Sequence, residues 1–328
     1  MAINYKQIND LDFFKFSRDD LECRFVPLFP IYRNNNWEMY INTENGFLPL
    51  NIVDRADGFY ISKEAVVKTD LRLNFFNFML KKNNFKENLK LLSHIYDDVY
   101  NLVASVEKIN FFASLHNMEE NFKLCKYASI ELESIFQNSR AVFDNLQKVQ
   151  DNLLKNIVSI NSDDYFSEKK VQFGINKEKR KLTIDEYIKK YKIPELLAKF
   201  YVDFQDFFFF ILNNRNDIFH SKKTFKLFLG EEGFSISLKE YELENLYFWN
   251  NDNTLRNNLG SIKSLLAYII LNTINALEEY SKTIELIIKL PDSVIPEYEI
   301  FIRSEFNNTI FDLDTYKISN AWNNKKNG

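Results

Sequence analysis

The chain has 328 residues, a net charge of −4 at pH 7 and a hydrophobic content of 45%. So many apolar residues exclude an intrinsically disordered chain, and the acidic balance excludes a surface that is basic all round. With seven glycines and six prolines, the sequence has too few turn residues for an all-β protein, so we expect a mainly α-helical fold.

The N-terminal part, from about residue 22 to residue 62, alternates short apolar pieces with turn signals. The pieces RFVPLFPIY, WEMYI, FLPLNIV and FYIS are separated by RNNN, NTENG and DRADG, which is typical of short strands and their turns. We therefore predict a strand-containing N-terminal region of unknown role at residues 1–83, followed by a helical domain at residues 84–328.

Two long helices are predicted at the start of this helical domain. The first has apolar residues at three- and four-residue steps, which indicates one buried helix face: Leu89, Leu92, Tyr96, Val99, Val103, Val106 and Ile109. The same spacing continues over residues 118–160, where no proline interrupts it.

The polar connection that follows carries the most basic stretch of the chain. Residues 169–192 hold nine lysines and arginines against three acidic residues, which is a local charge of +6. This stretch is either a solvated linker with a charged helix start or a local patch for a nucleic-acid backbone. Within it, Thr183 and Glu186 have the spacing of a capping box, which predicts a helix beginning after Thr183.

A further helix is predicted from Pro194 to His220, because apolar residues recur on one wide face and proline suits a first helical turn. Two alternating runs around GEEG predict a β-hairpin near residues 224–242. A last long helix is expected over residues 261–290, where Pro291 stops it, with a partly irregular tail beyond.

Export and membrane signals are absent from the pattern. The N-terminal residues lack the basic-then-apolar layout of a signal peptide, and the best apolar run, Leu265–Leu277, is too short to span a bilayer. Two cysteines, Cys23 and Cys125, cannot staple a chain of this size with disulfides. We therefore expect a cytoplasmic protein with no membrane partner.

Several kinds of chemistry have no motif here. The glycines form neither a phosphate loop nor a dinucleotide fingerprint, and no histidine, cysteine or carboxylate cluster has the spacing of a metal site. We expect no metal and no cofactor. His94 and His116 are interpreted as structural or surface histidines, and the pair Asp97–Asp98 as part of a solvated helix face.

The polar end of the helix predicted at residues 194–220 carries the candidate site. In NNRNDIFHSKK, Asn216 and His220 lie four residues apart on one helix face, and Arg215 can reach round to them. An arginine fork binds phosphate and stabilises negative charge in a transition state, while histidine moves a proton near neutral pH. In the alternative interpretation, Arg215 pairs with a carboxylate and the helix dipole alone favours His220.

The segment RNDIFH resembles the Rx4-6H signature of the HEPN superfamily, in which a polar residue typically follows the arginine on a helix of a compact bundle. Arg215, Asn216 and His220 match this pattern, outside the branch with an HxY extension. The earlier segment SRAVFDNLQKV is similar to the arginine-and-aspartate helix that precedes the motif in some HEPN-like proteins. An i,i+4 ion pair explains Arg140 and Asp144 equally well.

The resemblance implies an antiparallel helical bundle over roughly residues 84–290, with the hairpin inserted after the motif helix. It also implies a metal-independent endoribonuclease that cleaves RNA by attack of the 2'-hydroxyl and leaves a cyclic phosphate. Arg215 would stabilise the phosphorane, Asn216 would orient the phosphate or the imidazole, and His220 would transfer the proton. Because in-line cleavage works best with both a base and an acid, a homodimer with a composite active site would supply the second histidine.

Five basic residues are the candidates for holding the RNA backbone: Lys179, Arg180, Lys181, Lys222 and Lys223. Family members commonly act as toxins or antiphage effectors, which implies that an antitoxin or a defence-system protein could be a partner. The alternative is a HEPN-like module that binds RNA or protein without catalysis. A third reading is a structural scaffold that neither binds nor cuts RNA.

Overall fold

The computed structural model describes residues 28–33, 36–43, 46–50, 58–83, 86–116, 120–157, 170–174, 180–221, 224–241, 243–255, 257–288 and 297–318. The chain divides into two compact units, residues 1–57 and residues 58–328. The first unit contains a small sheet, and the second contains the hydrophobic core.

The first unit contains a three-stranded antiparallel sheet in chain order. Its strands are β1 (Leu28–Arg33), β2 (Asn36–Thr43) and β3 (Gly46–Leu50). The register pairs Tyr32 with Trp37 and Asn42 with Phe47. The strands predicted from the alternation of apolar pieces and turn signals are therefore confirmed in this part of the chain.

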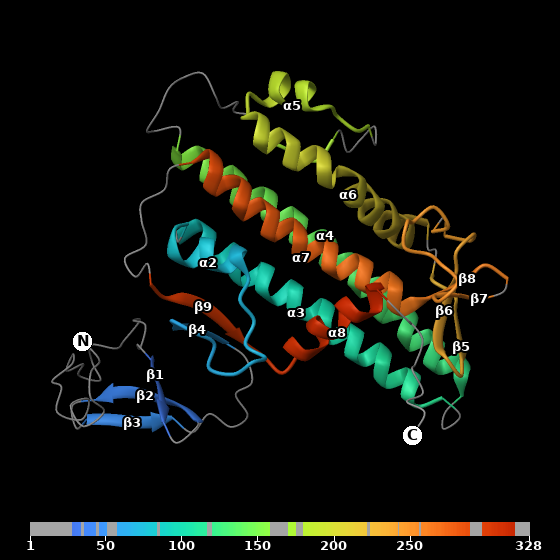
Figure 1. Cartoon of the computed structure of the whole chain (residues 1–328), viewed down its shortest axis with the longest axis horizontal. Helices are drawn as coiled ribbons and strands as arrows, with labels where there is room; N and C mark the ends of the chain where they lie inside the picture. Colours follow the sequence, from blue (N-terminus) through green and yellow to red (C-terminus); the bar gives the residue numbers. More distant parts are fainter. Residues whose placement is uncertain are drawn as a thin grey trace. The chain divides into compact units, whose positions relative to one another are not determined.

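The second unit is mainly α-helical, as predicted. Its described helices are α2 (Asn74–Lys81), α3 (Lys86–Ser114), α4 (Asn121–Ile157), α5 (Ile184–Tyr191), α6 (Glu195–Ser221), α7 (Ile262–Ile287) and α8 (Asn307–Ile318). Figure 1 shows the long helices α3, α4, α6 and α7 side by side, each running opposite to the one before it in the chain. No helix in the described ranges has the length and apolar character needed to cross a membrane.

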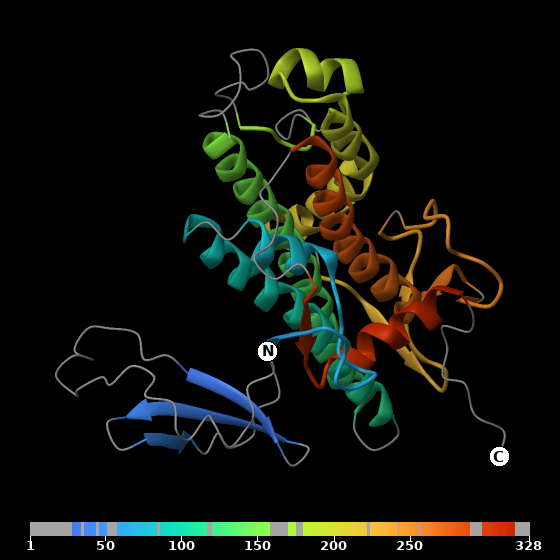
Figure 2. The ribbon, with the colours of Figure 1, turned by 60° about the vertical axis from the view of Figure 1, so that its left-hand side comes forward.

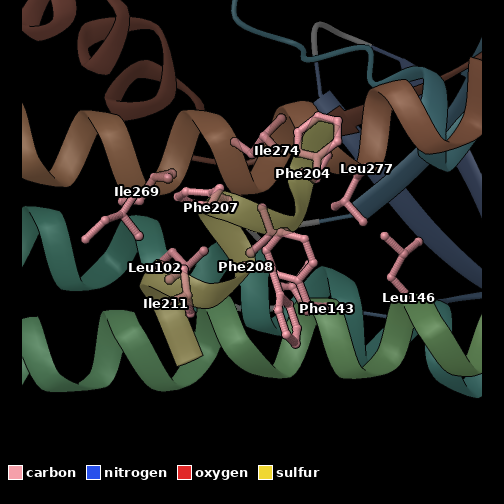
Figure 3. Close-up of a cluster of buried hydrophobic side chains, with 14 of the residues drawn as sticks. Leu102, Phe143, Leu146, Phe204, Phe207, Phe208, Ile211, Ile269, Ile274 and Leu277 are labelled. Atoms are coloured by element: carbon pink, nitrogen blue, oxygen red, sulfur yellow. The ribbon is translucent and has the colours of Figure 1, made fainter. Parts of the chain in front are cut away.

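The long helices bury their apolar faces against one another, because apolar residues recur every three or four positions along each of them. Figure 3 shows that one hydrophobic cluster contains side chains from all four helices: Leu102 of α3, Phe143 of α4, Phe208 of α6 and Ile269 of α7. All four side chains are fully shielded from water. Burial of each such side chain contributes roughly 2 to 3 kcal/mol. This core fixes the position of α6, on which the candidate residues lie.

The first turn of α3 departs from the predicted apolar face. Leu89 is 44% exposed, whereas its neighbour Asn88 is fully buried. The amide of Asn88 donates to Oδ1 of Asn83 and accepts from Nδ2 of Asn152 of α4, both over 3.0 Å. Because this polar contact occupies the interface between α3 and α4, the leucine beside it faces solvent, and its predicted burial is wrong.

The capping box predicted at Thr183 is confirmed at the start of α5. Oγ1 of Thr183 accepts a hydrogen bond from the backbone N–H of Glu186 over 3.3 Å, and the Glu186 carboxylate accepts one from the Thr183 N–H over 2.9 Å. These reciprocal bonds satisfy two N–H groups that a helix start leaves without partners.

The structure divides the chain after residue 57 rather than after residue 83. β4 (Gly58–Ser62) pairs in antiparallel fashion with β9 (Glu299–Arg303), and both belong to the second unit. The strand β9 and helix α8 also show that the tail beyond Pro291 is more regular than predicted. Local patterns cannot reveal a pairing between segments so distant in the sequence, so β4 reads locally as one of the N-terminal strands.

The predicted hairpin is confirmed and forms part of a larger sheet. The strands are β5 (Leu227–Gly230), β6 (Gly233–Ser237), β7 (Thr254–Leu255) and β8 (Leu259–Ser261), in the order β5-β6-β8-β7. Figures 1 and 2 show this sheet at the end of the bundle where α6 ends and α7 begins. At Gly260 a Cβ atom would lie 2.5 Å from Leu238 and 2.7 Å from Trp249, so the close contact there requires glycine.

A buried carboxylate fixes β4, β9 and the segment between β4 and α2. Asp70 accepts hydrogen bonds from Nε and Nη2 of Arg303 over 2.9 and 2.8 Å, from the Tyr60 hydroxyl, and from the Val67 N–H over 2.9 Å. Burial alone would raise the pKa of Asp70, but the hydrogen bonds from Arg303 and Tyr60 outweigh it and hold the pKa below its usual value.

We expect Asp70→Asn to lower the free energy of unfolding by about 2 kcal/mol at pH 7, because it removes charge-assisted hydrogen bonds. Since the folded pKa of Asp70 is depressed, this stabilisation is complete above the unfolded pKa of about 3.9 and is lost as the pH falls through the folded value. Urea unfolding of both proteins from pH 7 downwards measures the difference, which should shrink in acid. Asp203→Asn, at an exposed position of α6, is the control. An equal deficit at all pH values contradicts the prediction.

Candidate functional site

Helix α6 carries the candidate catalytic positions on its last two turns. It spans Glu195–Ser221, so Arg215, Asn216 and His220 all lie on one helix, as predicted. Just before them, Phe208 and Ile211 are fully buried and anchor the helix in the core. Outside the described part of the structure lie the side chain of His220 and the predicted RNA-binding residues Lys179, Lys222 and Lys223.

Arg215 and Asn216 contact one another directly. Nη1 of Arg215 donates a hydrogen bond to Oδ1 of Asn216 over 3.3 Å, and both side chains are half-buried. The bond restrains the guanidinium plane. His220 follows Asn216 by four residues, which puts the two positions on one face of α6. An arginine, an amide and a histidine position therefore lie together at the end of the helix.

A second arginine, Arg140 of α4, packs against α6. Its Nη2 pairs with Oδ1 of Asp144 over 2.8 Å, which confirms the i,i+4 ion pair expected from the spacing. Its Cζ lies 4.2 Å from the centre of the Phe208 ring, a distance at which the ring face attracts the cation. The Arg140 side chain is only 14% exposed. Arg140 is thus part of the α4–α6 interface as well as of an ion pair.

The directions of α4 and α6 bring Arg140 toward Arg215. Phe143 contacts Phe208, whereas Phe136, earlier on α4, contacts Phe210, later on α6, so the helices run antiparallel. Arg215 follows Phe208 by seven residues, or about two turns, and so lies on the same face of α6. A side chain on α4 that covers Phe208 therefore faces the stripe of α6 that includes Arg215.

Electrostatics reflect this closeness. Burial lowers the pKa of Arg140, the carboxylate of Asp144 raises it, and the positive charge of Arg215 lowers it again. Two like charges on neighbouring helices repel, and the low-dielectric surroundings strengthen that repulsion. The two guanidinium groups together make the electrostatic potential of this part of the α4–α6 interface more positive.

Two described residues of the basic stretch, Arg180 and Lys181, form ion pairs away from Arg215. Nη1 of Arg180 pairs with Glu186 over 2.7 Å, and Nζ of Lys181 pairs with Asp206 over 2.5 Å. Asp206 precedes Arg215 by nine residues, which is two and a half turns, or about 13.5 Å along the helix axis. The two positions therefore point to opposite sides of α6, and the structure does not bring Arg180 or Lys181 to Arg215.

A pocket of about 620 Å³ lies on this other side, at the start of α5. Lys181 and Gln205 are among the residues that line it. The amide of Gln205 accepts from the Leu182 N–H over 2.9 Å and donates to the Leu182 carbonyl over 3.0 Å, so it holds the segment before α5 in place. The polar atoms of Gln205 thus serve the fold, and this pocket is separate from the Arg215 region.

A half-buried carboxylate, Asp98, lies where the sequence predicts a solvated face. Asp98 of α3 accepts a hydrogen bond from Nδ2 of Asn145 of α4 over 3.3 Å. Burial raises the pKa of Asp98 to about 6, although Asn145 and the exposed His94 act in the opposite direction. The predicted solvated face is therefore wrong for Asp98, because α4 covers it, and it holds for the exposed Asp97.

We expect Asp98→Asn to raise the free energy of unfolding by about 1 kcal/mol at pH 7, after allowance for solvent screening. The folded pKa lies above the unfolded value near 3.9, so the ionised carboxylate destabilises the fold above about pH 6, and the penalty disappears below about pH 4. Thermal unfolding at pH 7 and pH 4 tests this, with Asp97→Asn as the exposed control. A variant that is less stable than wild type at pH 7 contradicts it.

Sequence reasoning missed three buried polar side-chain atoms on α4 and α6. Within the described ranges, Nη1 of Arg140, Oε1 of Glu133 and Oδ1 of Asn213 are buried without a hydrogen-bond partner. Glu133 precedes Arg140 by two helical turns and shares its face of α4. The only local signal was the spacing of Arg140 and Asp144, because the burial of these atoms depends on a helix that comes much later in the chain.

No family model, curated protein sequence or solved structure matches the chain.

Proposed function

We propose that the protein is a metal-independent endoribonuclease of the HEPN type, in which Arg215, Asn216 and His220 act on the scissile phosphate. The observation that supports this most is the placement of Arg215 and Asn216, which are hydrogen-bonded to each other about one turn beyond the buried Ile211, on the same helix end as His220. The nearby guanidinium of Arg140 adds positive charge where a phosphate would lie.

The chemistry follows from the three residue types. The 2'-hydroxyl of a ribose attacks the adjacent phosphorus, its proton leaves to a base, and the 5'-oxygen of the next nucleotide departs with a proton from an acid. His220 serves as the proton-transfer group, Arg215 stabilises the charge of the phosphorane, and Asn216 orients the phosphate or the imidazole. The product is an RNA end with a 2',3'-cyclic phosphate.

A homodimer is part of the proposal, since one histidine per chain supplies either the base or the acid but not both at once. Two copies of the α6 end would face one another across a composite site. The HEPN resemblance further suggests a cytoplasmic toxin or antiphage effector, with an antitoxin or another defence protein as partner.

The experiment is incubation of the purified protein with end-labelled tRNA and mRNA in the presence of a chelator. We expect discrete fragments that carry 2',3'-cyclic phosphate ends and that become phosphatase-sensitive only after the cyclic phosphate is opened. Light scattering at the same protein concentration reports the dimer. Intact RNA at high enzyme concentration, with the protein folded, counts against an endoribonuclease.

The alternative is an HEPN-like module that binds RNA or a protein without catalysis. The two neighbouring arginines favour it, because positive charge alone is enough to hold a phosphate. RNA binding that weakens with salt, without any product on a gel, selects this alternative. In that case Arg215→Ala lowers the affinity for RNA, and no cleavage is measured for either protein.

A further inference from the structure

One edge of the Arg140 guanidinium is buried and has no hydrogen-bond partner within the described ranges. Nη2 pairs with Asp144 over 2.8 Å, whereas Nη1 is left without an acceptor. Leaving a buried donor unpaired costs free energy, more so when it is charged, and folded proteins contain few such groups. A bound water or an anion satisfies such a donor, and the positive charge of the guanidinium favours the anion.

The plane of this guanidinium is fixed. The Phe208 ring lies 4.2 Å from Cζ on one face, and the ion pair with Asp144 holds one edge. Phe208 itself is held by Phe173, whose ring stacks on it at a centroid distance of 4.8 Å. A planar fork held in this way loses little freedom when it binds a phosphate.

Arg215 supplies the second positive charge. It lies two turns beyond Phe208 on the same face of α6, and its charge acts on Arg140 across the interface. An anion between the two guanidinium groups would replace their repulsion by two attractions. Solvent reaches the ion pair at Asp144, which is 44% exposed, whereas Arg140 is 14% exposed and its Nη1 is buried.

We propose that Arg140 and Arg215 hold one phosphate of the RNA between them, with one arginine on each non-bridging oxygen. This deepens the proposed function and rests on it for the identity of the substrate. A phosphodiester has two non-bridging oxygens and one negative charge, which suits two forks that approach from α4 and α6. Arg140 is thus a second phosphate-binding residue, supplied by a helix outside the motif.

The first experiment uses inorganic phosphate as the probe and the full chain. Phosphate binding is measured by calorimetry and by the rise in melting temperature, for wild type, Arg140→Lys and Arg215→Lys. We expect each lysine variant to bind phosphate about tenfold more weakly, because lysine keeps the charge but loses the two-pronged geometry. Arg72→Lys, at an arginine that is 49% exposed and paired with Glu299, is the matched control and should bind as wild type does.

A purely structural role for Arg140 gives a different result. In that case Arg140→Lys has a lower melting temperature than wild type but the same affinity for phosphate. That outcome overturns the proposal. Should Arg140→Lys not fold, Asp144→Asn replaces it, since loss of the competing carboxylate should tighten phosphate binding several-fold. No gain in the affinity of that variant also overturns the proposal.

The RNA arm separates this inference from the proposed function. With a substrate of single-stranded RNA, Arg140→Lys should raise KM about tenfold and lower kcat much less than a change at His220 does. If wild type cleaves RNA and Arg140→Lys has unchanged kinetics, the proposed phosphate-binding role of Arg140 is wrong and the proposed ribonuclease activity is supported. If wild type does not cleave RNA, and phosphate binding nevertheless depends on Arg140, the proposed anion site is supported and the proposed ribonuclease activity is wrong.

Discussion

His220→Ala is expected to lower the rate of RNA cleavage about 1000-fold, because it removes the only proton-transfer group of the motif. The fold should be unaffected, since position 220 lies in the last turn of α6, after the buried segment that anchors the helix. Cleavage of labelled RNA in chelator measures the rate, and far-ultraviolet circular dichroism with a melting curve reports the fold.

The chain offers its own controls for this prediction. Its other two histidines are His94, which is exposed, and His116, which is half-buried, and neither lies on α6. His94→Ala and His116→Ala should therefore cleave RNA at the rate of wild type. Undiminished cleavage by His220→Ala, or an equal loss in all three variants, means that His220 is not the proton-transfer group.

Phe208→Ala is expected to lower the free energy of unfolding by about 4 kcal/mol, since it opens a large cavity in a closely packed core. Phe208 has no exposed surface, and its ring contacts those of Phe143 and Phe173 at centroid distances of 5.7 and 4.8 Å. The ring is also the surface on which Arg140 lies, so the same change frees that guanidinium. Urea unfolding followed by fluorescence and circular dichroism measures the loss.

Phe228→Ala is the matched control, because Phe228 on strand β5 is 48% exposed. Its truncation should cost roughly 0.5 kcal/mol or less, as for most surface positions. A deficit of less than about 1 kcal/mol for Phe208→Ala contradicts the packing described here. Since the affinity for phosphate should also fall in Phe208→Ala, the variant links the stability of the core to the anion site.

The positions of the long helices can be predicted from the local sequence pattern, and so can most of the strands and the helix cap. Apolar residues at helical spacing locate α3, α4, α6 and α7 to within a few residues, because each helix must hide one face from water. The capping box at Thr183 and the hairpin at Gly230–Gly233 are equally local, since the hydrogen bonds that define them join residues three apart. The candidate triad at residues 215, 216 and 220 also follows from its spacing on one helix.

Features that depend on distant partners do not follow from the pattern. The assignment of β4 to the helical unit depends on β9, and the half-burial of Asp98 depends on Asn145 of α4. The basic stretch has a local charge of +6, but two of its described residues are paired away from Arg215: Arg180 with Glu186 of α5, and Lys181 with Asp206 on the opposite side of α6. The net charge of a stretch can be counted from the sequence, whereas the side of the molecule on which its side chains lie cannot be predicted from it.

The sequence by itself determined a helical protein with an arginine, an amide and a histidine on one helix end, because helical periodicity and i,i+4 spacing are properties of adjacent residues. Only the tertiary structure decided that Arg140 lies on Phe208, with one buried N–H edge that has no partner among the described residues, and that the charge of Arg215 acts on it. That placement depends on how α4 packs against α6, and such packing depends on the shapes of both buried faces together.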